Sequence, residues 1–418
     1  MENSGPFSRW ARQVKAWASP ADDVLDPLLP TAARASLADA ERLLHIPVRN
    51  TTEEDDECTR LRSVGQFLAR QDRWCDLAAK IRMAERARSK TPGGMPVTDL
   101  LAFGARNDVV AAAEHAISEG VPAGSPALLS GIGGLEAVLS EHDTDPAIAL
   151  VVALAHIDIG WAWRGSDAEI DVPKQHKSAF AAHFDRAGKI LDRFNGVELD
   201  SPALAAARCA LLPGLRDPRA RIADDYEDLI DLDPHNERHM RAMGNHLLPR
   251  WFGDYAQLEL EARRTASRSQ DIWGHAGYTW VMFDAVANDE GACAVVDTDF
   301  FIDGLKDILL RRPGQATANL LAAYCAVSIA RHGPHHATAP TLAACAEWVI
   351  RDHMTELHPL IWAHAAEGFD NAASVTSLSR FAAHGKARAL AVLSDLFEAE
   401  IAEGQQITFT PEGVEITP

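Results

Sequence analysis

Apolar residues recur at helical spacing on either side of a break near the middle of the chain. Between residues 224 and 231 they fall at Tyr226, Leu229 and Ile230, on one face of a helix. Pro234 must end that helix, because the residue before a proline is forced out of the helical region. The pattern therefore predicts a helix that stops just before Pro234.

A second helix is predicted directly after this break. Asn236 is a favourable N-cap, and Glu237 in the first turn suits the positive end of the helix dipole. Pro249 and Gly253 then interrupt the chain, and residues 255–266 resume a helical pattern. Two helices joined by a short turn form a helical hairpin. The apolar positions of the middle helix are Met240, Met243, Leu247 and Leu248.

The same order of signals occurs earlier, over residues 64–87. Gly65 lies in a first helix, a polar turn with Trp74 follows, and small residues such as Ala84 and Ala87 line a second helix. This order resembles the tetratricopeptide pattern, although the hairpin described above has two more residues between its glycines. We therefore expect an all-α chain in which helical hairpins stack as a right-handed α-solenoid.

The end of the chain departs from the helical pattern. Residues 406–417 alternate polar and apolar side chains around Pro411, Glu412 and Gly413, which predicts a small β-hairpin. A chain of 418 residues exceeds a usual single core, so several subdomains are expected. We divide the chain into N-terminal helices (1–50), helical hairpins (51–140), a central helical-repeat domain (141–285), C-terminal hairpins (286–404) and the β-hairpin tail (405–418).

Short sequence signals predict helix boundaries and a linker in the first half of the chain. Five consecutive acids, Glu53 to Glu57, follow two threonines and favour a helix N-terminus over a site for a cation or basic partner. Two glycines and two prolines make residues 89–96 the clearest internal linker. Helices are expected over residues 10–17, 32–44, 98–105 and 109–118, and again after Pro126 and Pro173.

The charge of the chain narrows the classes of partner. Sixty acidic against forty basic residues give a formal net charge of -20, which repels nucleic acid and anionic membranes. The longest apolar stretch, residues 147–159, contains His156 and Asp158 and is shorter than a membrane-spanning helix. The first residues lack the basic lead and apolar core of a signal peptide. We expect a cytoplasmic protein whose six cysteines are reduced.

Several short motifs follow one another between residues 141 and 285. They are W-x-x-R-G at 161–165, D-P-x-N at 233–236, L-P-R-W at 248–251 and A-R at 262–263. In this order they resemble a bacterial helical-repeat family known only as a domain of unknown function. Phe252 and Asp254 stand where that family has a glycine and a serine. The resemblance implies a helical-repeat architecture and supplies no activity.

These motifs contribute most of the candidate binding residues. Arg164, beside Gly165, complements the negative end of a helix or anchors an anion or carboxylate of a partner. Tryptophans of this region fill a core or line a groove. The candidate binding residues are Trp161, Arg164, His239, Arg250, Trp251 and Arg263.

The histidines of the central region suggest chemistry without specifying it. His239 and His246 lie seven residues apart, on one side of a helix, with His235 just before it. A zinc site there lacks a carboxylate or cysteine at the expected spacing, so no metal is predicted. The phosphate-loop, metalloprotease and nucleophile-elbow motifs are absent from the sequence. We therefore name no catalytic residue, no metal ligand and no cofactor.

Two classes of function remain open. The first is a non-catalytic protein whose stacked hairpins present a groove, with exposed residues such as Trp251, to a protein or peptide, preferably a basic one. The second is an enzyme of unknown type with a deep pocket that contains His239 or His246 and carboxylates such as Asp224 or Asp225. The first is favoured because helical arrays more often bind than catalyse.

Overall fold

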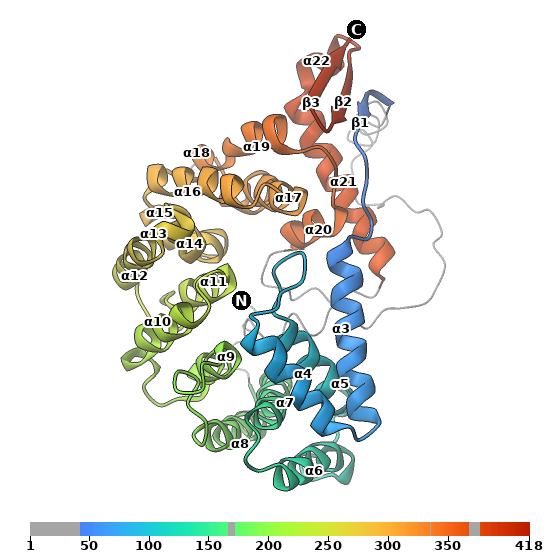
Figure 1. Cartoon of the computed structure of the whole chain (residues 1–418). Helices are drawn as coiled ribbons and strands as arrows, with labels where there is room; N and C mark the ends of the chain where they lie inside the picture. The colour runs from blue at the N-terminus through green and yellow to red at the C-terminus, as the bar shows by residue number, and fades with distance from the viewer. Residues whose placement is uncertain (1–41, 166–171, 335, 368–376) are drawn as a thin grey trace. The chain divides into compact units, whose positions relative to one another are not determined.

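The computed structural model describes residues 42–165, 172–334, 336–367 and 377–418. These residues are mostly helical, as predicted, and include one small sheet (Figure 1). By their contacts they form two compact units. The first unit holds residues 53–246 and 250–252, and the second holds residues 42–52, 247–249 and 253–418. The change between units therefore falls within the range 141–285 that was taken above as one domain.

In the first unit, the longest helices pack against the helix two positions further along the chain. α3 packs on α5, and α5 packs on α7, which also lies along α8. Two short 3-10 helices, Leu212–Gly214 and Pro218–Ala220, follow α9. The helices are α3 (Glu53–Arg70), α4 (Trp74–Arg86), α5 (Val97–Ser118), α6 (Pro126–Glu141), α7 (Pro146–Arg164), α8 (Lys174–Leu191), α9 (Pro202–Ala210), α10 (Ile222–Leu232) and α11 (Glu237–His246).

Two glycines set the close approach of α3 and α5. A Cβ atom on Gly65 would lie 2.1 Å from the carbonyl oxygen of Leu101, and one on Gly104 would lie 2.0 Å from that of Arg62. Each helix therefore places a glycine against the backbone of the other. Gly65 lies in a helix as predicted, although it contacts α5 and not α4, the second helix of the predicted hairpin. The run of acids that begins at Glu53 is confirmed as a helix start.

α7 is the central helix of the first unit. Asp145 caps it by accepting a hydrogen bond from the backbone N–H of Ala147, and it ends at Gly165, whose φ is 64°. Its 19 residues extend beyond the stretch 147–159, so the expectation that it is too short to cross a membrane is wrong. It is the one described helix with that length and composition, and 83% of its apolar window is buried inside the structure. This burial is that of a core helix.

After α4, one expectation needs correction and one, the internal linker over residues 89–96, is confirmed. The separate helices predicted over residues 98–105 and 109–118 are one continuous helix, α5, because no glycine or proline separates them. Residues 89–96 are a short connection within the first unit, and Glu54 fixes it. The Glu54 carboxylate accepts hydrogen bonds from the Thr91 hydroxyl, at 2.8 Å, and from the backbone N–H of Gly93, at 2.6 Å.

The break between α10 and α11 is confirmed. α10 ends at Leu232, two residues before Pro234, and α11 begins at Glu237. Asn236 is the N-cap as predicted, since its side-chain oxygen accepts a hydrogen bond from the backbone N–H of Arg238 at 3.3 Å. This turn brings Asp233 and α11 toward the other elements that form the site described below.

The second unit is also built from packed helices. α14 packs between α12 and α16, α17 contacts α19 and α20, and α21 lies along α20. α17 continues into a π-helical segment, Tyr324–Ile329, and a 3-10 turn, Ala330–His332. The helices are α12 (Tyr255–Arg268), α13 (Gln270–Trp273), α14 (Ala276–Asn288), α15 (Glu290–Val295), α16 (Thr298–Arg311), α17 (Gln315–Ala323), α18 (Ala339–Ala343), α19 (Cys345–His353), α20 (Pro359–Glu367), α21 (Leu378–Leu396) and α22 (Glu398–Ala402).

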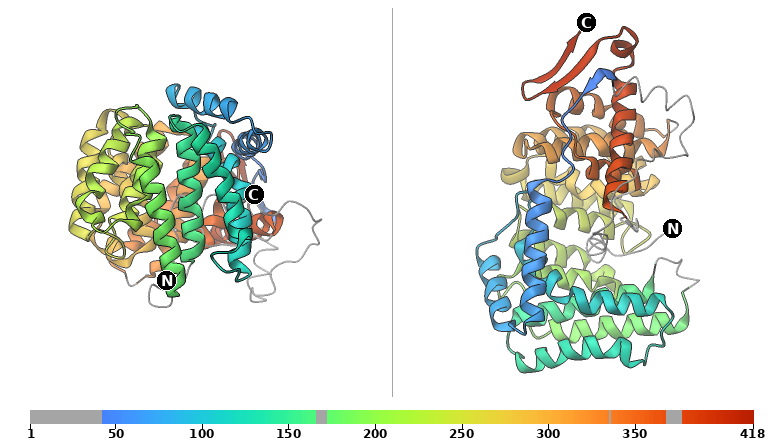
Figure 2. Two further views of the ribbon diagram at one scale, coloured as in Figure 1. Left: turned by 90° about the horizontal axis from the view of Figure 1, so that it is seen from below. Right: turned by 90° about the vertical axis from the view of Figure 1, so that its right-hand side faces the viewer.

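A three-stranded sheet belongs to the second unit. β2 (Gln406–Thr410) and β3 (Gly413–Thr417) form the predicted antiparallel hairpin, with Thr410 opposite Gly413. β1 (Leu44–His45) pairs in parallel with β2, beside the hairpin in Figure 2. Arg42 and Leu43 are helical and Leu44 begins β1, so the helix expected over residues 32–44 ends one residue earlier than predicted. The rest of the N-terminal helices lies outside the described residues. A two-residue strand carries too little alternation to be recognised from sequence.

Candidate functional site

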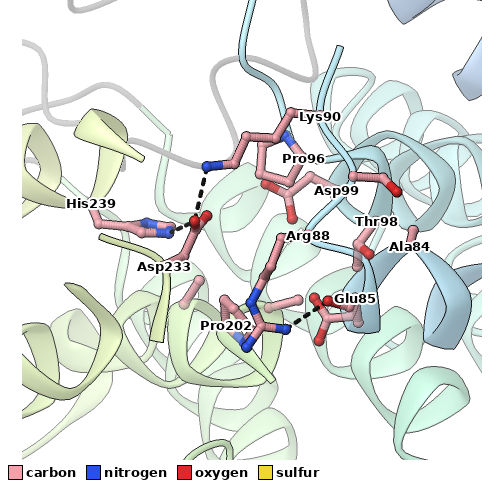
Figure 3. Close-up of a pocket in the computed structure, with 13 residues that line it drawn as sticks. Ala84, Glu85, Arg88, Lys90, Pro96, Thr98, Asp99, Pro202, Asp233 and His239 are labelled. Atoms are coloured by element: carbon pink, nitrogen blue, oxygen red, sulfur yellow. Dashed lines mark hydrogen bonds and ion pairs between the residues drawn. The ribbon is translucent and has the colours of Figure 1, made fainter. Parts of the chain in front are cut away.

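A small hollow in the first unit gathers ionisable side chains from several elements. Its cavity volume is about 20 Å³, and it opens to solvent. Its walls come from α4, the 89–96 connection, the start of α5, the start of α9 and residues 233 and 239. Figure 3 shows Lys90, Asp233 and His239 on one side, with Glu85 and Asp99 opposite.

On one side of the hollow, called the first wall below, the negative charge of Asp233 is balanced by its neighbours. The Lys90 ammonium donates a hydrogen bond to its Oδ1 at 2.8 Å, and His239 Nε2 lies 3.8 Å from its Oδ2. Burial would raise the pKa of Asp233, but the interactions with His239 and Lys90 outweigh it and hold the pKa at about 2. Asp233 is therefore a fixed negative charge that already has a lysine partner.

His239 lies on the same wall. It is only 4% exposed, and burial lowers its pKa although the Asp233 carboxylate opposes that change. Its Nε2 lies 3.0 Å from the Asn236 side-chain nitrogen. Its Nδ1 is buried without a hydrogen-bond partner in the part of the chain that the structure describes. An unsatisfied buried ring nitrogen costs free energy.

The opposite wall carries two carboxyl groups with raised pKa values. Burial raises the pKa of Glu85, against the opposing effects of a hydrogen bond from the Ser201 hydroxyl and the charge of Arg88. Burial, together with the negative charge of Glu85, raises the pKa of Asp99 to about 7. Both carboxyls therefore hold a proton more readily than an exposed acid does.

Arg88 lies between the two walls without pairing with either carboxyl of the second wall. Its Nη1 donates to the backbone carbonyl of Glu85 at 2.6 Å, and its Nε donates to that of Leu232 at 3.3 Å. Its Nη2 forms an ion pair with Asp200. The guanidinium is thus committed elsewhere. The described ion pairs of the hollow include Lys90 with Asp233 but no lysine or arginine with Glu85 or Asp99.

Trp161 and Trp251 belong to one aromatic cluster. Trp161 is buried in α7, and its ring centroid lies 5.4 Å from that of Phe180, 5.9 Å from that of Phe184 and 6.2 Å from that of Trp251. Trp251 is half-buried, at the edge of this cluster. Most of the tryptophan surface in this region therefore fills the core, and Trp251 retains an exposed part.

The two predicted arginines of the first unit have different surroundings. Arg164 is buried in the last turn of α7, where it complements the helix dipole as expected. Arg250 is exposed, and its Nη2 donates a hydrogen bond to the Asn245 side chain at 2.8 Å. Neither residue lines the hollow.

Arg263 belongs to the second unit, whereas the other five candidates belong to the first. Its guanidinium forms ion pairs with Glu259 and Asp297, both at 2.7 Å. It also lies over the rings of Tyr278 and Phe300, at 5.6 Å and 5.4 Å from their centroids. Arg263 thus contacts residues of α12, α14 and α16, and these contacts stabilise the packing of the second unit.

The predicted pocket of histidines and nearby acids is only partly assembled. His246 does not line the hollow. It is buried against Tyr226, whose hydroxyl lies 2.9 Å from its Nδ1. Asp225 pairs with Arg221 at 2.6 Å, and Asp224 is exposed. Within the described residues, no group of three or more His, Cys, Asp or Glu side chains is arranged to hold a metal ion.

Sequence reasoning missed the carboxyls and the lysine of the hollow. Glu85 is in the last turn of α4, Lys90 is in the 89–96 connection, and Asp99 is in the first turn of α5. Each has an ordinary explanation as a surface or helix-start residue. Only the approach of residues 233–239 to α4 and α5 in three dimensions makes them one site.

Comparison with protein-family models gives no match, and no curated protein and no solved structure shows significant similarity to the chain. The resemblance to a bacterial family of unknown function therefore stays a prediction.

Proposed function

We propose that this is a non-catalytic, cytoplasmic protein that binds a protein or peptide, and that a cationic side chain of this partner enters the hollow. In this proposal the helical hairpins stack as a right-handed α-solenoid. Packing of α3 on α5 and of α5 on α7 supports stacking, because each long helix contacts the next but one. The chain is acidic, which favours a basic partner and accelerates its approach.

One observation carries the proposal. Glu85 and Asp99 line the same hollow, and both have raised pKa values: burial raises that of Glu85, and burial with the negative charge of Glu85 raises that of Asp99. Arg106 and Arg238 lower the pKa of Asp99, but this effect is smaller than that of burial. A cation in contact with the two carboxyls would remove the repulsion and replace lost hydration.

The first wall of the hollow already contains a carboxylate paired with a cationic side chain. There the ammonium of Lys90 pairs with Asp233 at 2.8 Å, and both side chains are largely buried. An ammonium or guanidinium from a partner would make the equivalent contact on the second wall. The hollow is too small for a drug-sized ligand.

A second contact surface supports a peptide rather than a free cation. Arg250 is exposed and Trp251 is partly exposed, and arginine and tryptophan are enriched among residues that dominate binding energy. These two residues were the predicted centre of the binding surface. In this proposal they contact the partner's flanking residues, while the hollow selects its cationic side chain.

The proposal is tested with a panel of fluorescent peptides that carry lysine, arginine or uncharged norleucine at one central position. Anisotropy measures binding to the intact protein at pH 8. We expect at least one lysine or arginine peptide to bind at least tenfold more tightly than its norleucine analogue, about 1.4 kcal/mol. Equal affinities throughout the panel, or no binding, would contradict the proposal.

A matched pair of variants separates the hollow from the general negative charge. The Glu85→Gln, Asp99→Asn variant removes two carboxylates from the hollow, and Glu198→Gln, Asp217→Asn removes two exposed ones elsewhere in the first unit. The first variant should lose the preference for the cationic peptide. The second should keep it, with only the small change that screened long-range charge gives.

An acid–base enzyme is the second candidate, and one observation favours it. Asp99 has a pKa of about 7, which suits proton transfer at neutral pH, and His239 lines the same hollow. Chromogenic ester, amide and phosphoester substrates test this idea. Turnover that Asp99→Asn and His239→Gln each abolish would support it, and turnover unchanged by both would exclude this hollow as the catalytic site.

A further inference from the structure

Two histidines meet between α7 and α8, apart from the hollow. His156 is buried on α7 and His183 is half-buried on α8, and their Nδ1 atoms lie 2.9 Å apart. Neither residue lines the hollow. At this separation one ring nitrogen carries a proton and the other accepts it with its lone pair. Two nitrogens of the type that binds transition metals therefore lie side by side.

Glu136 of α6 decides which nitrogen of His156 carries a proton. Its Oε1 lies 2.8 Å from His156 Nε2, and Arg186 donates hydrogen bonds to both carboxylate oxygens. Because a carboxylate only accepts hydrogen bonds, His156 Nε2 must be the donor. In the uncharged ring the lone pair is therefore on Nδ1 and points toward His183. A carboxylate that accepts from the far ring nitrogen orients metal-binding histidines in the same way.

The distance between the two Nδ1 atoms matches that of two nitrogens bound to one metal ion. Imidazole nitrogen binds zinc at about 2.0–2.1 Å, so two such ligands lie about 2.9 Å apart at a right angle and about 3.3 Å apart at the tetrahedral angle. The observed 2.9 Å is within this range. His183 has only to move its ring proton from Nδ1 to Nε2, which leaves its charge unchanged.

We propose that His156 and His183 bind one divalent late transition-metal ion, of the class of Cu²⁺, Ni²⁺ and Zn²⁺, through their Nδ1 atoms, with water completing its coordination. This site is independent of the proposed function. Among the described residues no group of three or more His, Cys, Asp or Glu side chains is arranged to hold a metal ion. The protein therefore supplies two ligands, and the ion is exchangeable. A bound ion joins α7 to α8 and stabilises the folded chain.

The ligand atoms select the class of ion. Mg²⁺ and Ca²⁺ prefer oxygen ligands, whereas Cu²⁺, Ni²⁺ and Zn²⁺ bind imidazole nitrogen well. The two nearby charges act in opposite directions, since Arg186 opposes a positive charge at His156 and Glu136 favours one. The two nitrogens, more than the local charge, therefore determine which ion binds.

Copper(II) is the probe that tests the site. One equivalent is added to the intact protein, prepared without a histidine tag, and electron paramagnetic resonance counts the bound imidazole nitrogens. We expect two. His183→Gln should weaken copper affinity at least tenfold and remove one nitrogen from the spectrum. His115→Gln, at an exposed position of α5, is the matched control and should change neither. Mg²⁺ in large excess should not displace the copper.

Two further variants show where the ion lies and what orients its ligands. His332 and His336 of the second unit also have neighbouring rings, with centroids 5.6 Å apart. His336→Gln should leave copper affinity unchanged. Glu136→Gln removes the carboxylate that orients His156 and should weaken the affinity about 10–100-fold.

Circular dichroism without metal verifies that each variant is folded. If His183→Gln is unfolded, nitrogen-15 NMR of the wild type with Zn²⁺ replaces it, and binding should shift the Nδ1 signals of His156 and His183. Copper affinity that is unchanged in His183→Gln or lost in His336→Gln, or Nδ1 signals that do not shift, would overturn the proposal. None of these outcomes bears on peptide binding at the hollow, so the two proposals fail separately.

Discussion

Arg106 of α5 and Asp158 of α7 form an ion pair inside the first unit, with the arginine Nε 2.7 Å from the aspartate Oδ2 and side chains that are 6% and 3% exposed. Loss of one partner leaves a buried charge, so Asp158→Ala should lower the free energy of unfolding by about 3–5 kcal/mol. Urea unfolding followed by circular dichroism measures the change. Arg106→Met combined with Asp158→Leu should cost less than Asp158→Ala alone, because no uncompensated charge remains.

Replacement of a glycine by alanine should have opposite effects on stability at Gly65, in the contact of α3 with α5, and at Gly133, on the surface of α6. Gly65→Ala places a methyl group 2.1 Å from a carbonyl oxygen of α5, and the resulting shift should cost at least about 2 kcal/mol. Gly133→Ala, on an exposed position of α6 with no atom within 4 Å of the new methyl group, should stabilise by up to about 1 kcal/mol. Thermal unfolding of both variants checks this. Similar shifts in both would argue against the close crossing.

A pair of histidines between α7 and α8 should make stability depend on pH. His156 Nδ1 lies 2.9 Å from His183 Nδ1, and His156 Nε2 lies 2.8 Å from Glu136. Burial lowers the pKa of both rings, and that of His183 falls to about 4 because His156 adds to the effect. Unfolding therefore takes up protons below the unfolded pKa of about 6.5, and stability falls as the pH decreases from there toward 4.

Replacement of His183 isolates this contribution. His183→Gln should reduce the loss of stability between pH 6.5 and pH 4 by about 1 kcal/mol, a figure that allows for its partial exposure. His115→Gln, at an exposed position of α5, should leave the pH profile unchanged. Urea unfolding at four pH values gives both profiles. An unchanged profile for His183→Gln would show that the pair does not titrate as described.

Asn319 should be among the most sensitive positions of the second unit. Its side-chain oxygen accepts from the backbone N–H of His358 at 2.9 Å and from the Trp362 indole at 3.0 Å, and its nitrogen donates to the carbonyls of Gln315 and Glu356. Asn319→Ala leaves several buried groups unsatisfied and should cost at least about 3 kcal/mol. Asn319→Asp keeps the acceptor and should cost less at low pH than at neutral pH. Unfolding experiments on both variants test this.

The parts of the fold that could be predicted are those with strong local signals. Pro234 and Asn236 mark the boundary of α10 and α11, and the acids after Thr52 mark the start of α3. Gly413 and its flanking alternation mark the hairpin of β2 and β3. Each signal acts within a few residues, so one sequence suffices to detect it. The parallel pairing of Leu44 with Ile407 joins distant segments and leaves no local trace.

The hollow could not be predicted for a related reason. His239 was a candidate, but Glu85, Lys90 and Asp99 are ordinary polar residues until α4, α5 and the turn at Asp233 come together. A raised pKa arises from burial and from neighbours that are distant in sequence. His246 contacts Tyr226, and Asp225 pairs with Arg221. The alternative of a pocket that contains His239 or His246 with Asp224 or Asp225 stays a prediction.

The central claim is that Glu85 and Asp99 receive a cationic side chain of the partner. A double-mutant cycle tests it directly: the Kd of the best lysine peptide and of its norleucine analogue is measured at pH 8 on the wild type and on Glu85→Gln, Asp99→Asn. We predict that norleucine weakens binding to the wild type at least tenfold and leaves binding to the variant nearly unchanged, a coupling of about 1.4 kcal/mol or more. An equal loss on both proteins would place the lysine elsewhere and contradict the account.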